Sequence, residues 1–355
     1  MKERILVALS GGVDSLSTAV YLQKDYPVIG LHLQMNDTED NLEEMRLICK
    51  SLDIPFFVKN IQKEFRQNVI ETFKKEYLNA RTPNICTHCN HCVKIPALLD
   101  FADSEGINKI ATGHYAEIIQ KNGSYLLRMA KDRWKDQSYM LYRLNQQQLS
   151  RLVLPLGEIN KSAVKEFISK KGFDKIAKQR ESYSLCFTQG KNYKDFLLEQ
   201  CPELSSLENG TVINSMGERI GTHKGYPFYT VGQYKGLETK EKLYVTAIDH
   251  RQNLITAGQK SDCYHSTVEI NNLHLHQAKR IEDCEKFLIK IRGKDEGTTG
   301  SIRLSKQETQ DSTASNKESI KAIITFDNAV FAPMRGQDVV AYANDDTVVL
   351  GGVII

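Results

Sequence analysis

The stretch Ile5-Leu6-Val7-Ala8-Leu9-Ser10-Gly11-Gly12-Val13-Asp14-Ser15 decides the fold of the first half of the chain. A short apolar run, typical of a buried strand, leads into two adjacent glycines and then into a helix-like segment that reaches about Lys24. Paired glycines let a backbone turn sharply with its amides close to an anion, and a helix start adds unpaired N–H groups. The sequence therefore predicts a phosphate-binding loop, with Ser10 and Ser15 as extra donors and Asp14 as a ligand for Mg2+.

A strand–turn–helix corner without any ligand is the plain alternative for two glycines alone. The loop also lacks the Lys-Ser/Thr ending of a Walker A motif and the spacing of the dinucleotide fingerprint. The complete string from Ser10 to Ser15, at the first turn of the chain, nevertheless favours phosphate binding. It resembles the pyrophosphate loop of enzymes that split ATP into AMP and pyrophosphate to adenylate an oxygen.

Strand-like and helix-like segments alternate beyond this loop, which indicates a parallel sheet covered by helices on both faces. We therefore predict an α/β class with a doubly wound parallel sheet over residues 1–203. The expected segments after the first helix are Val28–Leu33, Asn41–Leu52, Pro55–Val58, Lys63–Tyr77, Ile95–Ala102, Lys109–Thr112, Asn160–Lys171 and Asn192–Gln200.

The sequence pattern changes after about Pro202, where short β-prone runs are separated by glycine turns. Such runs are typical of small barrels or sandwiches, so we predict two small β domains, 204–270 and a β-barrel at 271–355. The polar stretch Gln307–Lys317 is expected to be a loop. The predicted strands are Thr211–Ile213, Phe228–Val231, Tyr244–Ile248, Leu254–Thr256, Thr267–Ile270, Phe287–Ile291, Ser319–Phe326, Val339–Tyr342 and Val348–Ile355.

Composition sets limits on the class of protein. Charged residues make up 26% and hydrophobic residues 41% of the 355 positions, and no apolar run approaches the roughly 18 residues of a spanning helix. Because the chain enters a strand at once, we expect no signal peptide. With no spanning segment expected either, a cytoplasmic protein without membrane association is the default, and a monomer is the default oligomeric state. The net charge of +3 does not by itself identify a nucleic-acid partner; a tRNA binder of this balance has to gather its basic residues on one face.

Eight cysteines in such a chain are better explained by reduced thiols, redox groups or metal ligands than by structural disulfides. Cys86, Cys89 and Cys92 form a cluster interleaved with His88 and His91, whereas the other five are scattered. This spacing fits reactive thiols, and it also fits a metal site. A ferredoxin-type run has a further cysteine where this chain has Pro96, so a cluster needs Cys186 as its fourth ligand.

Several motifs, in order along nearly the whole chain, resemble the bacterial-type tRNA-specific 2-thiouridylase family. Thr82-Pro83-Asn84 followed by Cys89-Asn90, and later Glu181-Ser182 followed by Cys186-Phe187, carry the resemblance most specifically. Further matches are Ala111-Thr112-Gly113-His114-Tyr115-Ala116, Lys135-Asp136-Gln137-Ser138-Tyr139, Gly221-Thr222-His223-Lys224-Gly225, Tyr229-Thr230-Val231-Gly232-Gln233, Phe326-Asp327 and Leu350-Gly351-Gly352.

The resemblance implies an adenine-nucleotide alpha-hydrolase-like domain and a tRNA-uridine 2-sulfurtransferase. ATP, with Mg2+, adenylates O2 of the wobble uridine, U34, of certain tRNAs. The cysteine matching Cys186 takes a persulfide from a sulfur-carrier protein or a cysteine desulfurase. Its sulfur, directly or as released hydrosulfide, displaces AMP to give 2-thiouridine. Cys89 then forms a disulfide with Cys186, which a reductant resets. The uridine has to leave the anticodon stack for this reaction, because a stacked base hides its C2 edge.

The resemblance also implies roles for matching positions. Those for ATP are Ala8, Leu9, Ser10, Gly11, Gly12, Val13, Asp14, Ser15, Leu33 and Gly113. Those for the target base and the tRNA are Asn84, Ile85, Cys86, His114, Lys135, Asp136, Gln137, Arg292 and Gln337. Departures from the family pattern are Cys86 in place of an aspartate, Tyr234 in place of an arginine, Gly293 in place of a tyrosine and Arg335 in place of a proline.

Three alternatives stay open. The first is an iron–sulfur-dependent tRNA thiolase, with a [4Fe–4S] cluster or zinc on Cys86, Cys89, Cys92 and Cys186. The second is another adenylating amidotransferase or ligase with the same phosphate loop, which predicts no dependence on Cys89 or Cys186. The third is a non-enzymatic RNA-binding module whose cysteines form a structural metal site.

Overall fold

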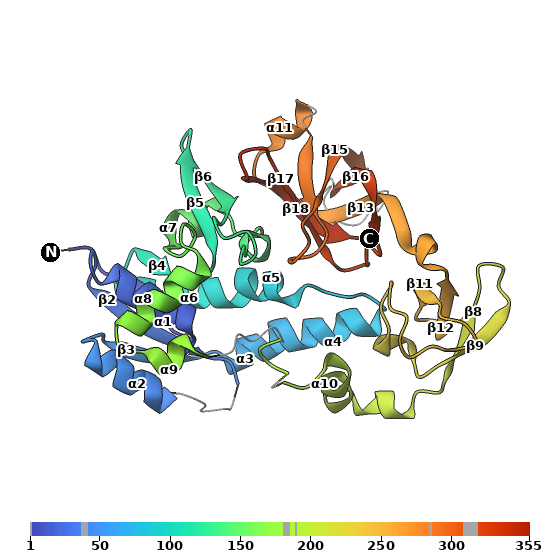
Figure 1. Ribbon diagram of the computed structural model, residues 1–355, viewed down its shortest axis with the longest axis horizontal. Helices are drawn as coiled ribbons and strands as arrows, with labels where there is room; N and C mark the ends of the chain where they lie inside the picture. The colour runs from blue at the N-terminus through green and yellow to red at the C-terminus, as the bar shows by residue number, and fades with distance from the viewer. Residues whose placement is uncertain (1, 37–41, 180–184, 189, 284–285, 308–318) are drawn as a thin grey trace, which may run out of the picture. The chain divides into compact units, whose positions relative to one another are not determined.

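The computed structural model describes residues 2–36, 42–179, 185–188, 190–283, 286–307 and 319–355 (Figure 1). Two compact units divide the chain. Unit 1 comprises Met1–Val69, Cys86–Tyr183 and Asp345–Val348, and unit 2 comprises Ile70–Ile85, Ser184–Asn344 and Val349–Ile355. Within the described residues, no helix is both long and apolar enough to cross a membrane.

Unit 1 is built on a five-stranded sheet with the order β3-β2-β1-β4-β7, and all neighbouring strands are parallel. The strands are β1 (Ile5–Ala8), β2 (Val28–Gln34), β3 (Phe56–Asn60), β4 (Lys109–Ala111) and β7 (Leu152–Val153). The predicted α/β class is confirmed. Strand order reverses at β1, which has β2 on one side and β4 on the other. In sheets of this type, ligands bind at that reversal, beyond the carboxyl ends of the strands.

Apolar residues of β1 form the centre of unit 1. Ile5 and Val7 are fully buried, and they share a core with α1 (Val13–Leu22) and α2 (Leu42–Ser51). The expected helix Lys63–Tyr77 divides into α3 (Gln62–Phe65), a π-helical turn η1 (Arg66–Ile70) and α4 (Glu71–Leu78). The remaining helices of four or more residues in the described part of unit 1 are α5 (Ile85–Cys89), the π-helical η2 (Asn90–Lys94), α6 (Ile95–Ser104), α7 (Gln146–Arg151), α8 (Lys161–Lys170) and α9 (Asp174–Ala177).

A hairpin of β5 (Ala116–Lys121) and β6 (Ser124–Met129) was not predicted. Its turn is Asn122-Gly123, and both residues have positive φ, 51° and 78°. An Asn-Gly pair between β-prone runs is the strongest short-range signal for a hairpin. The sequence therefore carries a local signal for this hairpin, within a half of the chain where strand-like and helix-like segments otherwise alternate.

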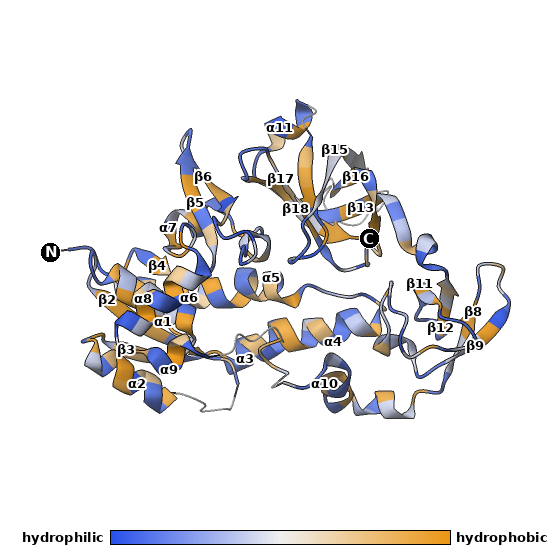
Figure 2. Cartoon of the chain, in the orientation of Figure 1, coloured by the Kyte–Doolittle hydropathy of each residue, from blue (hydrophilic) through white to orange (hydrophobic). Residues whose placement is uncertain are grey.

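Unit 2 contains a five-stranded sheet, β10-β9-β8-β12-β11, and a closed barrel, β13-β16-β15-β14-β17-β18. Hydrophobic residues concentrate along β17 and β18, which are buried throughout (Figure 2). The sheet strands are β8 (Gly210–Ile213), β9 (Arg219–His223), β10 (Glu238–Thr239), β11 (Tyr244–Asp249) and β12 (Leu254–Gly258). The barrel strands are β13 (Tyr264–Leu275), β14 (Phe287–Lys290), β15 (Thr298–Gln307), β16 (Ser319–Phe331), β17 (Asp338–Tyr342) and β18 (Val348–Ile354).

Most of the predicted short strands lie within these elements, but Phe228–Val231 was wrong. Pro227 opens a 3-10 turn at Tyr226–Phe228, and a proline ring favours such a turn because it fixes φ and removes an amide donor. The predicted boundary between the two β domains falls between residues 270 and 271. Strand β13 runs through this position and pairs with β16 and β18. Apart from Gln307 at the end of β15, the expected loop Gln307–Lys317 lies outside the described residues. The other helices of unit 2 are α10 (Tyr193–Gln200), α11 (Ala278–Glu282), and the short 3-10 turns η4 (Pro202–Ser206) and η6 (Lys260–Cys263).

Candidate active site

The loop between β1 and α1 is closed by its own serines. The Ser15 hydroxyl donates to the Gly12 carbonyl oxygen at 2.9 Å and accepts from the Ser10 amide at 3.1 Å. Gly11 has a φ of 81°, a conformation that favours glycine, and Gly12 stands at the start of α1. The structure thus has the expected sharp turn with the amino end of a ten-residue helix directly behind it.

Asp14 projects from the first turn of α1 into a network that was not predicted. The Lys161 Nζ atom lies 2.7 and 2.6 Å from its two carboxylate oxygens, and the Tyr115 hydroxyl donates to Oδ1 at 2.8 Å. The Lys161 side chain is 8% exposed and that of Asp14 is 33% exposed, so the ammonium is shielded from water and the carboxylate only partly. No local pattern marks Lys161, which lies 147 residues from Asp14; Tyr115 at least belongs to a motif already singled out.

Gly113 follows β4, the strand beside β1, and meets the phosphate loop. A Cβ atom built on Gly113 would lie 2.8 Å from the carbonyl carbon of Asp14. Contacts under 3 Å are not tolerated, so only glycine lets the two backbones approach this closely. The predicted loop and the predicted Gly113 therefore meet at the reversal of strand order, where a nucleotide is expected.

His114 has a half-buried ring whose Nδ1 atom lies 2.8 Å from the Thr112 hydroxyl. Burial, followed by the nearby Lys94 ammonium, lowers the pKa of His114 to about 4. The ring is therefore neutral at pH 7. On the other side of the loop, Leu33 is buried in β2, and His32 Nδ1 contacts the Leu9 carbonyl at 2.8 Å.

These residues fit a nucleoside triphosphate. The glycines leave room for close approach to phosphate, Ser10 and the helix start offer N–H and O–H donors, and the Asp14 carboxylate is the hard oxygen ligand that Mg2+ prefers. The ion, when bound, neutralises phosphate charge. Lys161 and Tyr115 hold the Asp14 carboxylate through both of its oxygens.

The cysteine cluster lies on one continuous helical segment made of α5, η2 and α6. Cys89 is 4% exposed, whereas Cys86 and Cys92 are exposed. The Cys92 Sγ atom lies 3.8 Å from His88 Nδ1, and His88 Nε2 lies 3.0 Å from the Asn68 carbonyl oxygen. Desolvation by the surrounding protein raises the pKa of the Cys92 thiol, and the nearby Arg143 guanidinium opposes this rise. This pair of Cys92 and His88 was not predicted as a unit.

The metal alternative gains no support from the described geometry. Among the residues that the structure describes, no group of three or more His, Cys, Asp and Glu side chains is arranged to hold a metal ion. Neighbouring cysteines of the cluster are three positions apart along the helix, and the middle thiol is buried while the outer two face solvent.

The segment before the cluster is fixed within unit 2. The Gln337 side chain donates to the Thr82 carbonyl oxygen at 2.9 Å, and the Thr82 hydroxyl lies 2.7 Å from that of Thr230. Gln337 thus positions the backbone just before Asn84, which is half-buried, and Ile85, which is buried. Arg292 donates to the carbonyl oxygens of Phe331 and Ala332 at 3.1 and 2.6 Å. Their roles toward tRNA stay predictions.

Cys186 is exposed and lies in unit 2, on the short described segment 185–188. The next residue, Phe187, anchors this segment: its ring centroid is 5.4 Å from that of Phe73 on α4 and 4.9 Å from that of Phe196 on α10. Thr188 is 2% exposed and its amide donates to the Leu185 carbonyl at 3.1 Å. The preceding Glu181-Ser182 of the family pattern lies outside the described residues.

The loop over residues 131–137 holds the predicted Lys135, Asp136 and Gln137. Asp136 is buried and accepts from the amides of Ala130 and Ser138 at 2.9 and 3.2 Å, so its described role is to shape the loop. The Gln137 side chain accepts from the Tyr115 amide at 3.0 Å. Trp134, the only tryptophan of the chain, is 86% exposed at the tip, and sequence reasoning missed it.

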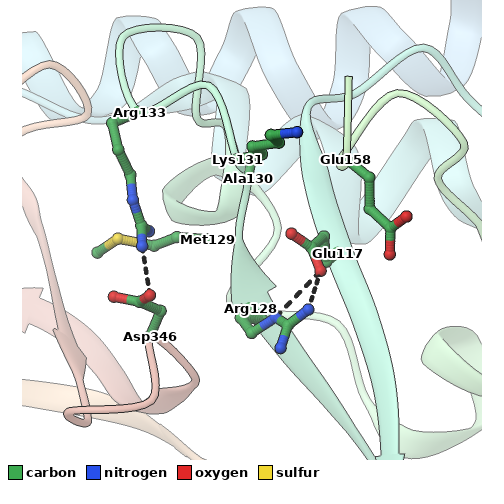
Figure 3. A pocket seen from close by; sticks show the side chains of 8 residues that line it. All are labelled: Glu117, Arg128, Met129, Ala130, Lys131, Arg133, Glu158 and Asp346. Carbon is green, nitrogen blue, oxygen red and sulfur yellow. Dashed lines mark hydrogen bonds and ion pairs between the residues drawn. The ribbon is translucent and has the colours of Figure 1, made fainter. Parts of the chain in front are cut away.

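A polar pocket lies next to this loop (Figure 3). Arg133 pairs with Asp346 and Arg128 pairs with Glu117 across it. Because acidic and basic side chains alternate and pair, the pocket is not a strongly basic surface, and no predicted catalytic residue lines it. Its lining consists of Glu117, Arg128, Met129, Ala130, Lys131, Arg133, Glu158 and Asp346.

Comparison with known proteins agrees with these features. Residues 3–190 match the model of the tRNA methyl transferase HUP domain, and residues 194–259 match that of the tRNA methyl transferase PRC-barrel domain. The tRNA-specific 2-thiouridylase MnmA of Chlorobium luteolum is 42% identical over 77% of this chain and 77% of the relative. The tRNA-specific 2-thiouridylase MnmA of Salinibacter ruber is 35% identical over 99% of this chain and 94% of the relative. That of Cytophaga hutchinsonii is 34% identical over 96% of each chain. With a phosphate loop at the strand reversal, both motif cysteines and relatives of this coverage, the chain belongs to the tRNA-specific 2-thiouridylase family.

Proposed function

We propose that the protein is a tRNA 2-thiouridylase that uses ATP to activate a uridine and then replaces its O2 by sulfur. The near end-to-end likeness to tRNA-specific 2-thiouridylases carries this proposal. The meeting of Gly113 with Asp14 at the nucleotide edge of the sheet supports the ATP half of the reaction. The HUP-domain match has the same implication.

In the first step, uridine O2 attacks the α-phosphorus of ATP, and pyrophosphate leaves. Ser10, Ser15 and the start of α1 hold the phosphates through hydrogen bonds, and these donors stabilise the charge that develops on the phosphoryl oxygens. Asp14, fixed by Lys161, supplies the oxygen ligand for the ion that accompanies ATP. The product is an adenylated uridine whose C2 carries AMP as leaving group.

In the second step, the terminal sulfur of a persulfide on Cys186 bonds to C2 and AMP departs. The Cys89 thiolate then attacks the Cys186 sulfur, which releases 2-thiouridine and leaves a disulfide between Cys89 and Cys186. The persulfide sulfur is reduced by the two electrons that the two thiols lose. The exposure of Cys186 supports its loading by an external persulfide, from a carrier protein or a desulfurase.

On the tRNA side, Trp134 is a candidate because its ring is 86% exposed and an exposed aromatic ring can stack on an unpaired base. Lys131, Arg133 and Lys135 lie beside it in sequence, and an indole face with nearby cations suits an unpaired base. This placement supports a role for the loop of residues 131–137 in holding tRNA. Since the chain has no other tryptophan, its fluorescence reports on this loop alone.

The test is thiolation of a U34-containing tRNA transcript by anaerobically purified full-length protein with MgATP and glutathione persulfide. We expect 2-thiouridine with wild type and Cys49→Ala, loss with Cys89→Ser and Cys186→Ser, and quenching of Trp134 fluorescence by the tRNA. Iron and zinc are counted in each preparation. ATP-independent or absent thiolation would overturn the function, and activity that tracks iron would replace the two-cysteine reaction with a cluster mechanism.

A further inference from the structure

The pair of Cys92 and His88 has the arrangement of an activated nucleophile, and the proposed reaction leaves it without a role. A carbonyl oxygen only accepts, so the contact from His88 Nε2 to the Asn68 carbonyl at 3.0 Å places a proton on Nε2. In the neutral ring, Nδ1 is then the acceptor, and it faces the Cys92 sulfur at 3.8 Å. A thiol, a base and a group that orients the base recur where thiols act as nucleophiles, and such contacts are often long before substrate binds.

The orienting carbonyl comes from an irregular part of the helix. Asn68 lies in the π-helical turn Arg66–Ile70, which interrupts the regular hydrogen-bond ladder. Cys92 itself lies in a second π-helical turn, Asn90–Lys94. Single π turns within α-helices are frequent at functional sites. Two such turns therefore meet at the His88 imidazole, one through a carbonyl oxygen and the other through a thiol.

Cys92 also lies within reach of the proposed catalytic thiol. Cys89 and Cys92 are three positions apart on a continuous helical segment, a spacing at which helical Cα atoms lie about 5–6 Å apart. Disulfides span Cα separations of about 4.4–6.8 Å. Cys89 is 4% exposed and Cys92 is exposed, so a bond between them would join a buried sulfur to one that solvent reaches.

We propose that Cys92, with His88 as its base, is a resolving cysteine that opens the disulfide formed after sulfur transfer. This inference rests on the proposed function. The Cys92 thiol gives its proton to His88 Nδ1, and its sulfur bonds to Cys89 Sγ. The bond from Cys89 to Cys186 breaks, and Cys186 leaves as a thiolate that is ready for the next persulfide. No net oxidation occurs in this exchange; a dithiol reductant then reduces the disulfide between Cys89 and Cys92.

Intramolecular attack has a physical advantage here. A thiol held three residues away acts at an effective concentration far above that of any cellular reductant. The exchange also moves the oxidised pair onto one helix and presents the Cys92 sulfur to solvent.

The experiment follows one turnover of full-length protein charged with glutathione persulfide, with MgATP and tRNA but without reductant. Acid quenching, alkylation and peptide mass spectrometry then identify the disulfide. We expect wild type and the control Cys49→Ala to end with a disulfide between Cys89 and Cys92 and an alkylated Cys186. Cys92→Ser is expected to stop at the disulfide between Cys89 and Cys186, and His88→Gln to form the final disulfide about 100-fold more slowly.

Adding dithiothreitol separates the first turnover from later ones. Cys92→Ser should keep its first equivalent of 2-thiouridine and lose most of its later rate. A wild-type enzyme that stops at the disulfide between Cys89 and Cys186, or a Cys92→Ser enzyme that turns over normally, would overturn the resolving role and leave the thiolase function intact. Absence of the first equivalent in wild type would instead overturn the proposed function, and this inference with it.

Discussion

The phosphate loop in unit 1 and the segment that carries Cys186 in unit 2 are fixed by different means. The loop from Ser10 to Ser15 lies between a fully buried strand and a ten-residue helix, and its serines close it internally. The segment 185–188 forms part of no helix or strand, and it is anchored chiefly through the ring of Phe187. The proposed phosphate loop is thus held by the sheet and its first helix, whereas the position of Cys186 depends on a few side chains.

The largest expected effect comes from removing that anchor. Phe187 is 7% exposed and packs against Phe73 and Phe196, so Phe187→Ala should destabilise unit 2 by about 3 kcal/mol through lost burial and an unfilled cavity. We also expect sulfur transfer to fall far more than release of pyrophosphate. Urea denaturation measures the first effect, and parallel assays of pyrophosphate and 2-thiouridine measure the second.

Phe57→Ala is the matched control, because Phe57 is 41% exposed and lies in unit 1. Its stability change should stay below about 1 kcal/mol. Equal losses of adenylation and sulfur transfer in Phe187→Ala would contradict the idea that the two regions are held independently.

The second effect tests how far the phosphate loop depends on a distant residue. Lys161→Met removes the ammonium that contacts both Asp14 oxygens and leaves a partly exposed carboxylate without its cation. We expect a loss of about 2 kcal/mol in stability, less than for a fully buried pair, and roughly 100-fold slower release of pyrophosphate.

Lys170→Met, on the same helix but 73% exposed, is the control and should behave as wild type. A double variant with Asp14→Asn isolates the coupling between the pair, since most of the stability loss should disappear when both charges are removed. If Lys161→Met kept full pyrophosphate release, the ion pair would be structural only.

The same contrast explains what could be predicted from the sequence. The phosphate loop was found because buried strands, paired glycines and helix starts are local patterns, and Gly113 was placed beside it by a motif at the end of a strand. Lys161 was missed because its partner is 147 residues away and only folding brings them together. The interruption of the helix over Lys63–Tyr77 by a π turn was missed because the apolar period of a helix does not register one extra residue.

Residue roles were harder to predict than residue positions. Asp136 has a buried carboxylate that accepts from loop donors, and its expected contact with tRNA stays a prediction. Trp134, two residues earlier, is exposed, as are Lys131 and Arg133. A motif specifies which residues matter, but the direction of each side chain depends on turn geometry that composition does not encode.

The smallest effect concerns His114, at the edge where the phosphate loop meets β4. Its pKa is lowered to about 4, mainly by burial, while an unfolded histidine titrates near 6.5. Between these values the unfolded chain binds more protons than the folded one, so stability rises with pH from about 4 and is complete above about 6.5. The contribution should be about 1–3 kcal/mol, since the ring is partly exposed to solvent screening.

His114→Gln should therefore flatten the fall in stability between pH 6.5 and pH 4, as measured by urea denaturation at half-unit steps. Burial also lowers the pKa of His91 and of His223, so part of the slope should remain in the variant. His265→Gln, at an exposed position of β13, removes an imidazole from the surface and should leave the curve unchanged. If His114→Gln kept the full slope, the lowered pKa would not belong to His114 in the folded protein. Its imidazole would then carry a positive charge near pH 6, where it is proposed to contact tRNA.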